Sequence, residues 1–229
     1  MNFDPSDSIH GKWYDDACGT AFALELIGER WSLLIVRELL LGARRFTDLR
    51  GGLPGISAKV LTERLEGLER AGVVQRQKAP PPATGQLYEL TPWGYLAQEP
   101  VMALGRWAAR SPDHNPMLPL SCASLIISFR TMFDAGRAGG LAICGNLRLG
   151  RESFCVGVAQ GRLTAERGQV DQPDFTIEAP AAEPVAAAVY GKIAPEELAP
   201  AGLHVAGSRD AAMAFIDLFH LPAKMLRPS

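Results

Sequence analysis

A chain of 229 residues is long enough for two ordinary domains, and its 47 % hydrophobic and 21 % charged content is that of globular protein, which excludes wholesale disorder. The formal net charge of −2 means that any binding of nucleic acid must depend on a local basic region rather than on the chain as a whole. No run of about 18 apolar residues occurs and the first residues are polar and acidic, so we expect no signal peptide, no membrane insertion and a cytoplasmic location.

Two helices are expected first, in residues 18–42. Apolar residues recur at helical spacing almost throughout this segment, and a break at residues 28–30 (Gly-Glu-Arg) separates the two helices. Gly42 ends the second helix, because glycine adopts at low cost the conformation that follows a helix end.

A short helix and a tight turn are expected next. The segment RFTDLRGGLP (45–54) is amphipathic and ends in glycine and proline, which stop a helix, and Gly55 supplies the turn. A second helix follows in residues 56–72, with Ser57 as its N-cap and Gly72 as its stop.

Two short strands, VVQRQ (73–77) and QLYELT (86–91), follow the second helix and are joined by a proline-containing loop. The order of short helix, turn, helix and two-stranded wing is that of a winged helix-turn-helix, which lays its second helix in a DNA groove. We therefore predict a mainly α N-terminal domain that binds double-stranded DNA.

The second helix has an apolar face and a polar face. With Leu61, Leu65 and Leu68 inward, its polar residues point outward. Residues 44–78 hold eight Lys/Arg against four Asp/Glu, so positive charge gathers where a phosphate backbone would lie. The alternative is an ordinary solvated helix face. The predicted DNA-binding residues are Arg44, Arg45, Ser57, Lys59, Thr62, Glu63, Arg64, Arg76 and Lys78.

Residues 91–110 predict another helix, with Thr91 as its cap and Pro92 at its first position. Pro100 should kink this helix or end its first half. Helices that are apolar on more than one face commonly pack against a second copy of the chain. Five side chains could face a partner subunit or lie in the intrachain core: Trp93, Leu96, Val101, Leu104 and Trp107.

A linker rich in proline and polar residues (111–119) divides the chain into expected domains 1–112 and 113–229. The second half predicts a helix (121–135), two strands (141–150 and 152–168) that meet at a turn through Gly150-Arg151, and a third strand (174–180). A helix (182–192), a short strand (203–207) and a final helix (208–220) follow. This is an α+β layout with one face of the sheet covered.

The first half resembles the HxlR-type winged helix-turn-helix regulators of bacteria. The resemblance rests on Cys18 with ALELIGERWSLLIVREL after it, then RFTDLR, GISAKVLTERLEGLERAGVVQR and YELTPWG, and it covers roughly residues 12–110. It implies a homodimer that binds an inverted-repeat operator, with residues 57–66 in the major groove and the wing beside the minor groove.

Some members of that family sense oxidants or electrophiles through a cysteine before the first helix, and Cys18 occupies the matching position. A thiol near a helix N-terminus has a lowered pKa, whereas the neighbouring acidic Asp15 and Asp16 oppose this effect. The alternative for Cys18 is ordinary partial burial. The other cysteines are widely spaced and form no C-x-x-C pair, so neither a metal site nor a disulfide framework is expected.

The second half resembles the sterol-carrier-protein lipid-binding fold, through the block DFTIEAPAAEPVAAAVYGKIAPEELAPAGLHVAGSRDAAMAFIDLF (174–219). The resemblance implies an apolar cavity for fatty acyl or sterol-like ligands. The same side chains could instead form solid core. The predicted lining residues are Phe129, Phe133, Ile143, Phe154, Val156, Phe175, Ile177, Val189, Ile216 and Phe219.

These patterns predict a transcription regulator, a repressor by default, whose operator affinity is set by an apolar small molecule in the C-terminal domain. One alternative is a thiol-based sensor that uses Cys18 and a C-terminal domain that serves only in assembly. The chain has no G-x-S-x-G, H-E-x-x-H or phosphate-loop motif, and its four histidines (10, 114, 204, 220) are scattered. We therefore expect no catalysis, no cofactor and no metal.

Overall fold

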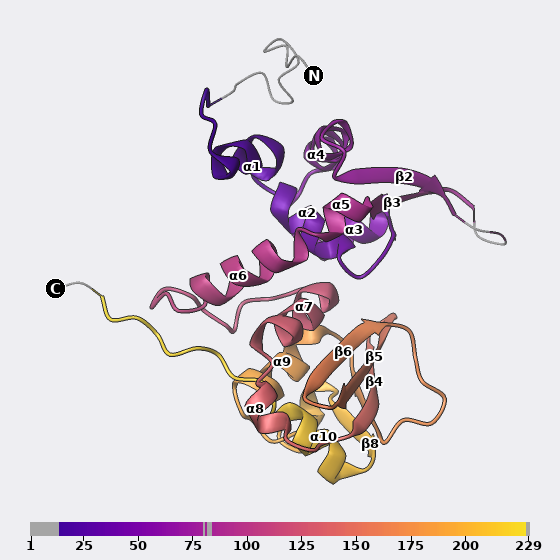
Figure 1. The fold of residues 1–229 in the computed structure, drawn as a ribbon. Coiled ribbons are helices and arrows are strands. Elements are labelled where there is room, and N and C mark those ends of the chain that lie inside the picture. Colours follow the sequence, from indigo (N-terminus) through magenta and orange to yellow (C-terminus); the bar gives the residue numbers. More distant parts are fainter. Residues whose placement is uncertain (1–13, 80, 82–83, 228–229) are drawn as a thin grey trace. The chain divides into compact units, whose positions relative to one another are not determined.

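The computed structural model describes residues 14–79, 81 and 84–227 (Figure 1). The chain divides into two compact units, one ending at Val101 and one beginning at Met102, which we call the first and second units. The boundary lies inside helix α6 (Gln98–Ala108), earlier than the predicted division at residue 112. The last turns of α6 belong with the second unit because Arg106 Nη2 donates a hydrogen bond of 2.7 Å to the carbonyl of Thr131. None of the described helices is both long enough and apolar enough to cross a bilayer.

The first unit has the predicted element order. Its strands form one antiparallel sheet in the order β1-β3-β2, so the wing has a third strand that the sequence pattern did not predict. That strand has only two residues, which is too short for any alternation of apolar and polar positions to show. The elements are α1 (Gly19–Ile27), α2 (Ser32–Leu39), β1 (Arg44–Arg45), α3 (Phe46–Gly52), α4 (Ala58–Arg70), β2 (Val74–Lys78), β3 (Gln86–Leu90), α5 (Pro92–Tyr95) and the start of α6.

Helix α4 begins and ends where the sequence predicted. The Ser57 hydroxyl accepts a hydrogen bond from the backbone N–H of Val60, which satisfies one donor of the first turn. Gly72 follows the helix with φ +71°, the left-handed conformation that favours glycine. The apolar face of α4 is buried, as expected, and its residues Leu61, Leu65 and Leu68 form the core of the unit with Ile35, Leu39 and Leu49.

The junction between the wing and α5 is held by Thr91. Its hydroxyl donates to the carbonyl of Gly72 at 2.7 Å and accepts from the N–H of Gly94 at 3.0 Å. Gly94 packs so closely on the residue before β2 that a Cβ there would lie 2.2 Å from the carbonyl oxygen of Val73. The expected break in the 91–110 helix is confirmed: α5 ends at Tyr95 and α6 begins at Gln98, just before Pro100.

The second unit is a five-stranded mixed sheet in the order β6-β5-β4-β7-β8, in which β4 and β7 are parallel and the other pairs are antiparallel. An α+β layout is therefore confirmed. The elements are α7 (Cys122–Met132), α8 (Ala135–Ala138), β4 (Ile143–Leu149), β5 (Glu152–Ala159), β6 (Arg162–Arg167), β7 (Phe175–Ala179), α9 (Ala182–Tyr190), the 3-10 turn η2 (Ala199–Ala201), β8 (His204–Gly207) and α10 (Arg209–Ile216).

The prediction of one strand over residues 152–168 is wrong, because the segment forms a hairpin of β5 and β6. Gln160 (φ +52°) and Gly161 (φ +70°) make a two-residue turn in which both residues have positive φ. Such a turn matches the twist of an antiparallel pair. The sequence pattern did not predict this turn, because glutamine rarely adopts a positive φ.

Aromatic rings fill the space between the sheet and its helices. Phe129 stacks on Phe219 with ring centroids 4.5 Å apart, and the edge of Phe215 meets both rings at 5.7 and 5.0 Å. Phe175 joins them at 5.3 Å from Phe215, and its ring lies over Gly145 of β4, where a Cβ would come within 2.3 Å of that ring.

Replacing Gly94 with alanine should destabilise the first unit, because the new Cβ must displace the backbone of Val73, just before β2. We expect Gly94→Ala to lower the free energy of unfolding by about 1–3 kcal/mol. Urea denaturation followed by tryptophan fluorescence measures this, since Trp31 and Trp93 belong to the first unit. The matched control is Gly51→Ala in α3, where nothing lies within 4 Å of an added Cβ. That change should leave stability unaltered or raise it by up to about 1 kcal/mol; equal effects would contradict the packing argument.

Candidate nucleic-acid interface

The first turns of α4 present polar side chains to solvent. Lys59 has 87 % of its side chain exposed, and its Nζ lies 3.9 Å from Glu63 Oε1, a loose ion pair at i, i+4. The Thr62 hydroxyl donates to the carbonyl of Ala58 at 3.0 Å, so its oxygen can still accept a bond. Ser57 is exposed as well, and these four predicted residues come together at one end of one helix.

Arg64, also predicted to bind DNA, is turned toward its own unit. Its Nη2 lies 3.0 Å from Glu29 Oε2 and its Nε donates to the carbonyl of Arg30 at 3.2 Å. Only 23 % of the side chain is exposed. The residue braces α4 against the turn between α1 and α2, so in this structure it positions the helix.

The wing carries the remaining predicted cations. Arg76 of β2 pairs with Glu69 of α4 at 2.7 Å and lies over the ring of Tyr88, so it fastens the wing to the helix. Arg45 Nη1 donates to the carbonyl of Thr84 at 2.7 Å, while Arg44 beside it is half-buried. Lys78 is exposed at the end of β2. Ion pairs at an exposed surface contribute only about 0–1 kcal/mol, so a phosphate could take over Arg76 at low cost.

Large apolar side chains are exposed on α1, on α5 and just after it, and on α6. Leu96 is 70 % exposed and Trp107 is 74 % exposed, and Trp93 and Leu104 are also exposed. Val101 differs from these four predicted residues because it is buried. Phe22 and Leu24 of α1 are exposed too, and the sequence pattern did not predict this. The only indication in the sequence that these two side chains are exposed is that the 18–42 segment is apolar on more than one helical face.

Cys18 is exposed at the N-cap of α1, which differs from the partial burial considered as its alternative. Hydrogen bonds from the backbone of Thr20 and Ala21, and from the Thr20 side chain, lower the pKa of the Cys18 thiol below its ordinary value. The Asp16 carboxylate, which was expected to raise the pKa of the Cys18 thiol, accepts a hydrogen bond of 2.9 Å from the backbone N–H of Cys18.

The predicted ligand-lining residues of the second unit pack together. Phe133 and Ile143 are half-buried, and the other predicted lining residues are buried. A pocket of about 230 Å³ lies elsewhere in this unit, between β8, α10 and the turn before them. Glu196 and Arg209 form an ion pair of 2.7 Å among its lining residues. The lining residues are Pro195, Glu196, Ala199, Leu203, His204, Val205, Arg209, Ala212 and Met213, none of which the sequence reading named.

The chain is similar to known proteins over the winged core. The model of the HxlR-like helix-turn-helix family matches residues 26–115. The uncharacterized HTH-type transcriptional regulator YvaP of Bacillus subtilis is 37 % identical over 91 residues, which are 40 % of this chain and 84 % of that protein. The uncharacterized HTH-type transcriptional regulator YtfH of Escherichia coli is 35 % identical over 97 residues, 42 % of this chain and 77 % of that protein. The reduced form of the transcriptional regulator YodB from B. subtilis is 33 % identical and covers 43 % of this chain and 97 % of its own, with a TM-score of 0.39.

These relatives confirm that the function predicted for the first unit, transcription regulation through a helix-turn-helix, is correct. The likeness of the second unit to sterol carrier proteins stays a prediction. The chain belongs to the HxlR-like helix-turn-helix family of transcriptional regulators.

Proposed function

We propose that this protein is a repressor that binds an inverted-repeat operator as a homodimer and releases it when an apolar small molecule occupies the second unit. The observation that carries the DNA-binding part is the exposed N-terminal end of α4. Ser57, Lys59 and Thr62 lie there together, and Arg64 and Arg76 fix the helix against its neighbours. A recognition helix contacts base edges with its N-terminal residues, and phosphate contacts from a wing set its register.

The homodimer is supported by the exposed apolar side chains beside the winged core. Trp93, Leu96, Leu104 and Trp107, with Phe22 and Leu24, leave much apolar surface in contact with water. Large apolar side chains exposed together on one helix, such as Leu104 and Trp107 of α6, often mark a protein interface. A symmetric dimer would cover these side chains and present two α4 helices to the two half-sites of an operator.

Control by a ligand is supported by the pocket of the second unit. Its walls include the apolar side chains of Leu203, Val205 and Met213, and the ion pair of Arg209 and Glu196 lies among the lining residues. A small apolar molecule with an acidic group would bind here by taking the place of Glu196 as the partner of Arg209. A ligand regulates an operator complex only if it binds one dimer geometry better than another, so occupancy must change the placement of the two recognition helices.

Loss of base contacts should weaken operator binding strongly. We expect the double variant Lys59→Ala, Thr62→Ala to lose about 30-fold or more in affinity for its operator, since each base contact contributes about 1–3 kcal/mol. Fluorescence anisotropy with an operator duplex and a scrambled duplex measures the change. Arg162→Ala, which removes an exposed cation from the second unit, is the control and should bind normally. An unchanged preference of the double variant for the operator duplex over the scrambled duplex would remove Lys59 and Thr62 from sequence recognition.

Octanoate, an apolar chain with one carboxylate, is a probe for the pocket. At saturating concentration it should raise the Tm of the protein by several degrees, because a ligand that binds only the folded state stabilises it. Met213→Trp, which fills the pocket, should abolish this shift. If the shift persists in Met213→Trp, the ligand enters the aromatic core that the sequence predicted. If the wild-type protein shows no shift, this ligand class is wrong.

Sensing through Cys18 is a second candidate function, favoured by the exposure of that thiol and its lowered pKa. A lowered pKa gives more thiolate at neutral pH, so iodoacetamide should modify Cys18 before the half-buried Cys122, Cys144 and Cys155. Treatment with diamide should then reduce operator binding by the wild-type protein and leave Cys18→Ser unaffected. Equal loss of binding in both proteins would exclude Cys18 as the sensor.

A further inference from the structure

The C-terminal tail, residues 220–227, is bound at its far end to the segment that follows α6. Lys224 Nζ donates to three carbonyl oxygens, those of Ala109 (3.0 Å), Ser111 (3.0 Å) and His114 (2.9 Å). An ammonium group has three N–H donors, so this site uses all of them. The last carbonyls of a helix have no partner within it, and a cation there also meets the negative end of the helix dipole. Lys224 therefore caps the carbonyl of Ala109, the residue just after α6, and joins it to the turns that follow.

Two further contacts fix the same end of the tail. The N–H of Met225 donates to the carbonyl of Arg110 at 2.7 Å, and Arg227 pairs with Asp113. The residues that follow α6 are themselves folded into turns, since Ser111 N donates to Ala108 O and His114 N donates to Ser111 O. The tail and these turns thus support each other.

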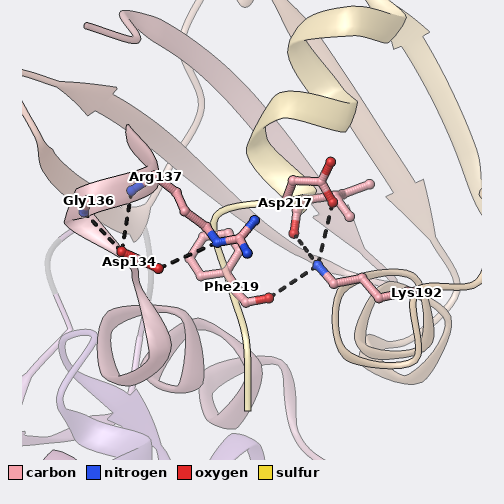
Figure 2. Close-up of polar contacts among 7 residues, drawn as sticks. Asp134, Gly136, Arg137, Lys192, Asp217 and Phe219 are labelled. Atoms are coloured by element: carbon pink, nitrogen blue, oxygen red, sulfur yellow. Dashed lines mark hydrogen bonds and ion pairs between the residues drawn. The ribbon is translucent and has the colours of Figure 1, made fainter. Parts of the chain in front are cut away.

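The near end of the tail is anchored in the core of the second unit (Figure 2). Lys192 Nζ donates to the carbonyls of Ile216 and Phe219, each at 3.2 Å, and lies 3.5 Å from Asp217 Oδ1. Lys192 has φ +54°, an uncommon conformation for a lysine, and these contacts hold it there. The fully buried Phe219 stacks on Phe129 and forms a β-bridge with Phe133. Residues 220–223 alone separate these two anchors.

Helix α6 links this tail to the surface proposed for dimerisation. The helix starts in the first unit, and its last turns carry the exposed Leu104 and Trp107. We propose that the C-terminal tail is a clasp that caps α6 and makes the dimer surface of that helix depend on the aromatic core of the second unit. The proposal rests on the homodimer proposed above. Only four residues separate Phe219 from Lys224. A ligand that shifts Phe219 would therefore move Lys224 and break its hydrogen bond to the carbonyl of Ala109, just after α6.

His114 reports on the state of the clasp. Burial, and then the nearby charge of Lys224, lower the pKa of His114. Its Nδ1 lies 3.3 Å from Lys224 Nζ. Release of the clasp relieves both causes, so the pKa of His114 should rise toward its ordinary value. NMR titration of the histidine ring measures this directly.

Two variants open the clasp through different atoms. Lys224→Met removes the ammonium group, and Met225→Pro removes the N–H that bonds to Arg110. We expect hydrogen–deuterium exchange at the amides of Ser111 and His114 to become about tenfold faster in both full-length variants, the change that corresponds to the loss of one hydrogen bond. Sedimentation equilibrium should show a dimer that dissociates at least about threefold more readily. Arg151→Met, which removes an exposed cation from the turn between β4 and β5, is the matched control and should change neither quantity.

Each result decides the proposal. Unchanged exchange in both variants, or exchange and dimerisation that change equally in Arg151→Met, overturns it. Faster exchange with an unchanged dimer dissociation constant overturns the coupling between the tail and the dimer surface. A monomeric wild-type protein overturns it as well. Failure of the wild-type dimer to bind any operator fragment would refute only the proposed repressor function, because exchange, titration and dimer constant are measured without DNA.

Discussion

The burial of one face of α4 is the constraint on which the rest of the first unit depends. Leu61, Leu65 and Leu68 are buried against a core that includes Ile35 of α2, and this fixes the rotation of the helix about its axis. The opposite face is therefore exposed in a single orientation, with Lys59 and Thr62 at its N-terminal end. Burial of each such apolar side chain contributes about 1.5–3 kcal/mol, more than any exposed ion pair. The hydrophobic contacts thus set the direction of the recognition face.

Polar contacts then refine what burial sets. Arg64 joins α4 to the turn after α1, and Arg76 joins it to the wing. These two arginines are among the residues that the charge pattern marked for DNA, yet the structure uses them within the unit. Charge counts along a sequence identify cations but not their partners, because Glu29 and Glu69 reach them only in the folded chain. The local excess of positive charge therefore could not show which of these cations already have a carboxylate partner.

The fold of the first unit was largely predictable because local signals and tertiary structure agree there. Ser57 and Thr91 cap the helices that follow them with their hydroxyl groups, and Pro92 begins α5. Gly72 follows α4 in the left-handed conformation. In the second unit the turn at Gln160 and Gly161 was missed, since its signal depends on a conformation that glutamine seldom adopts. The exposed pocket was missed for a different reason. Its lining residues come from β8, α10 and the turn between α9 and β8, and no pattern of spacing predicts how completely side chains from separate segments fill a volume.

The ends of α4, α10 and α6 are satisfied in two different ways. The N-terminus of α4 is satisfied by its own neighbour Ser57, so the recognition helix needs no distant residue to begin. The ends of α10 and α6 are satisfied by Lys192 and Lys224, which come from other parts of the chain. A locally capped helix persists whenever its core face is buried. A carbonyl whose donor comes from a distant segment loses that donor when the segment moves and must then bind water. In the proposed homodimer, a ligand would therefore act on the turns after α6 and leave α4 folded, and it would change the spacing of the two α4 helices without unfolding them.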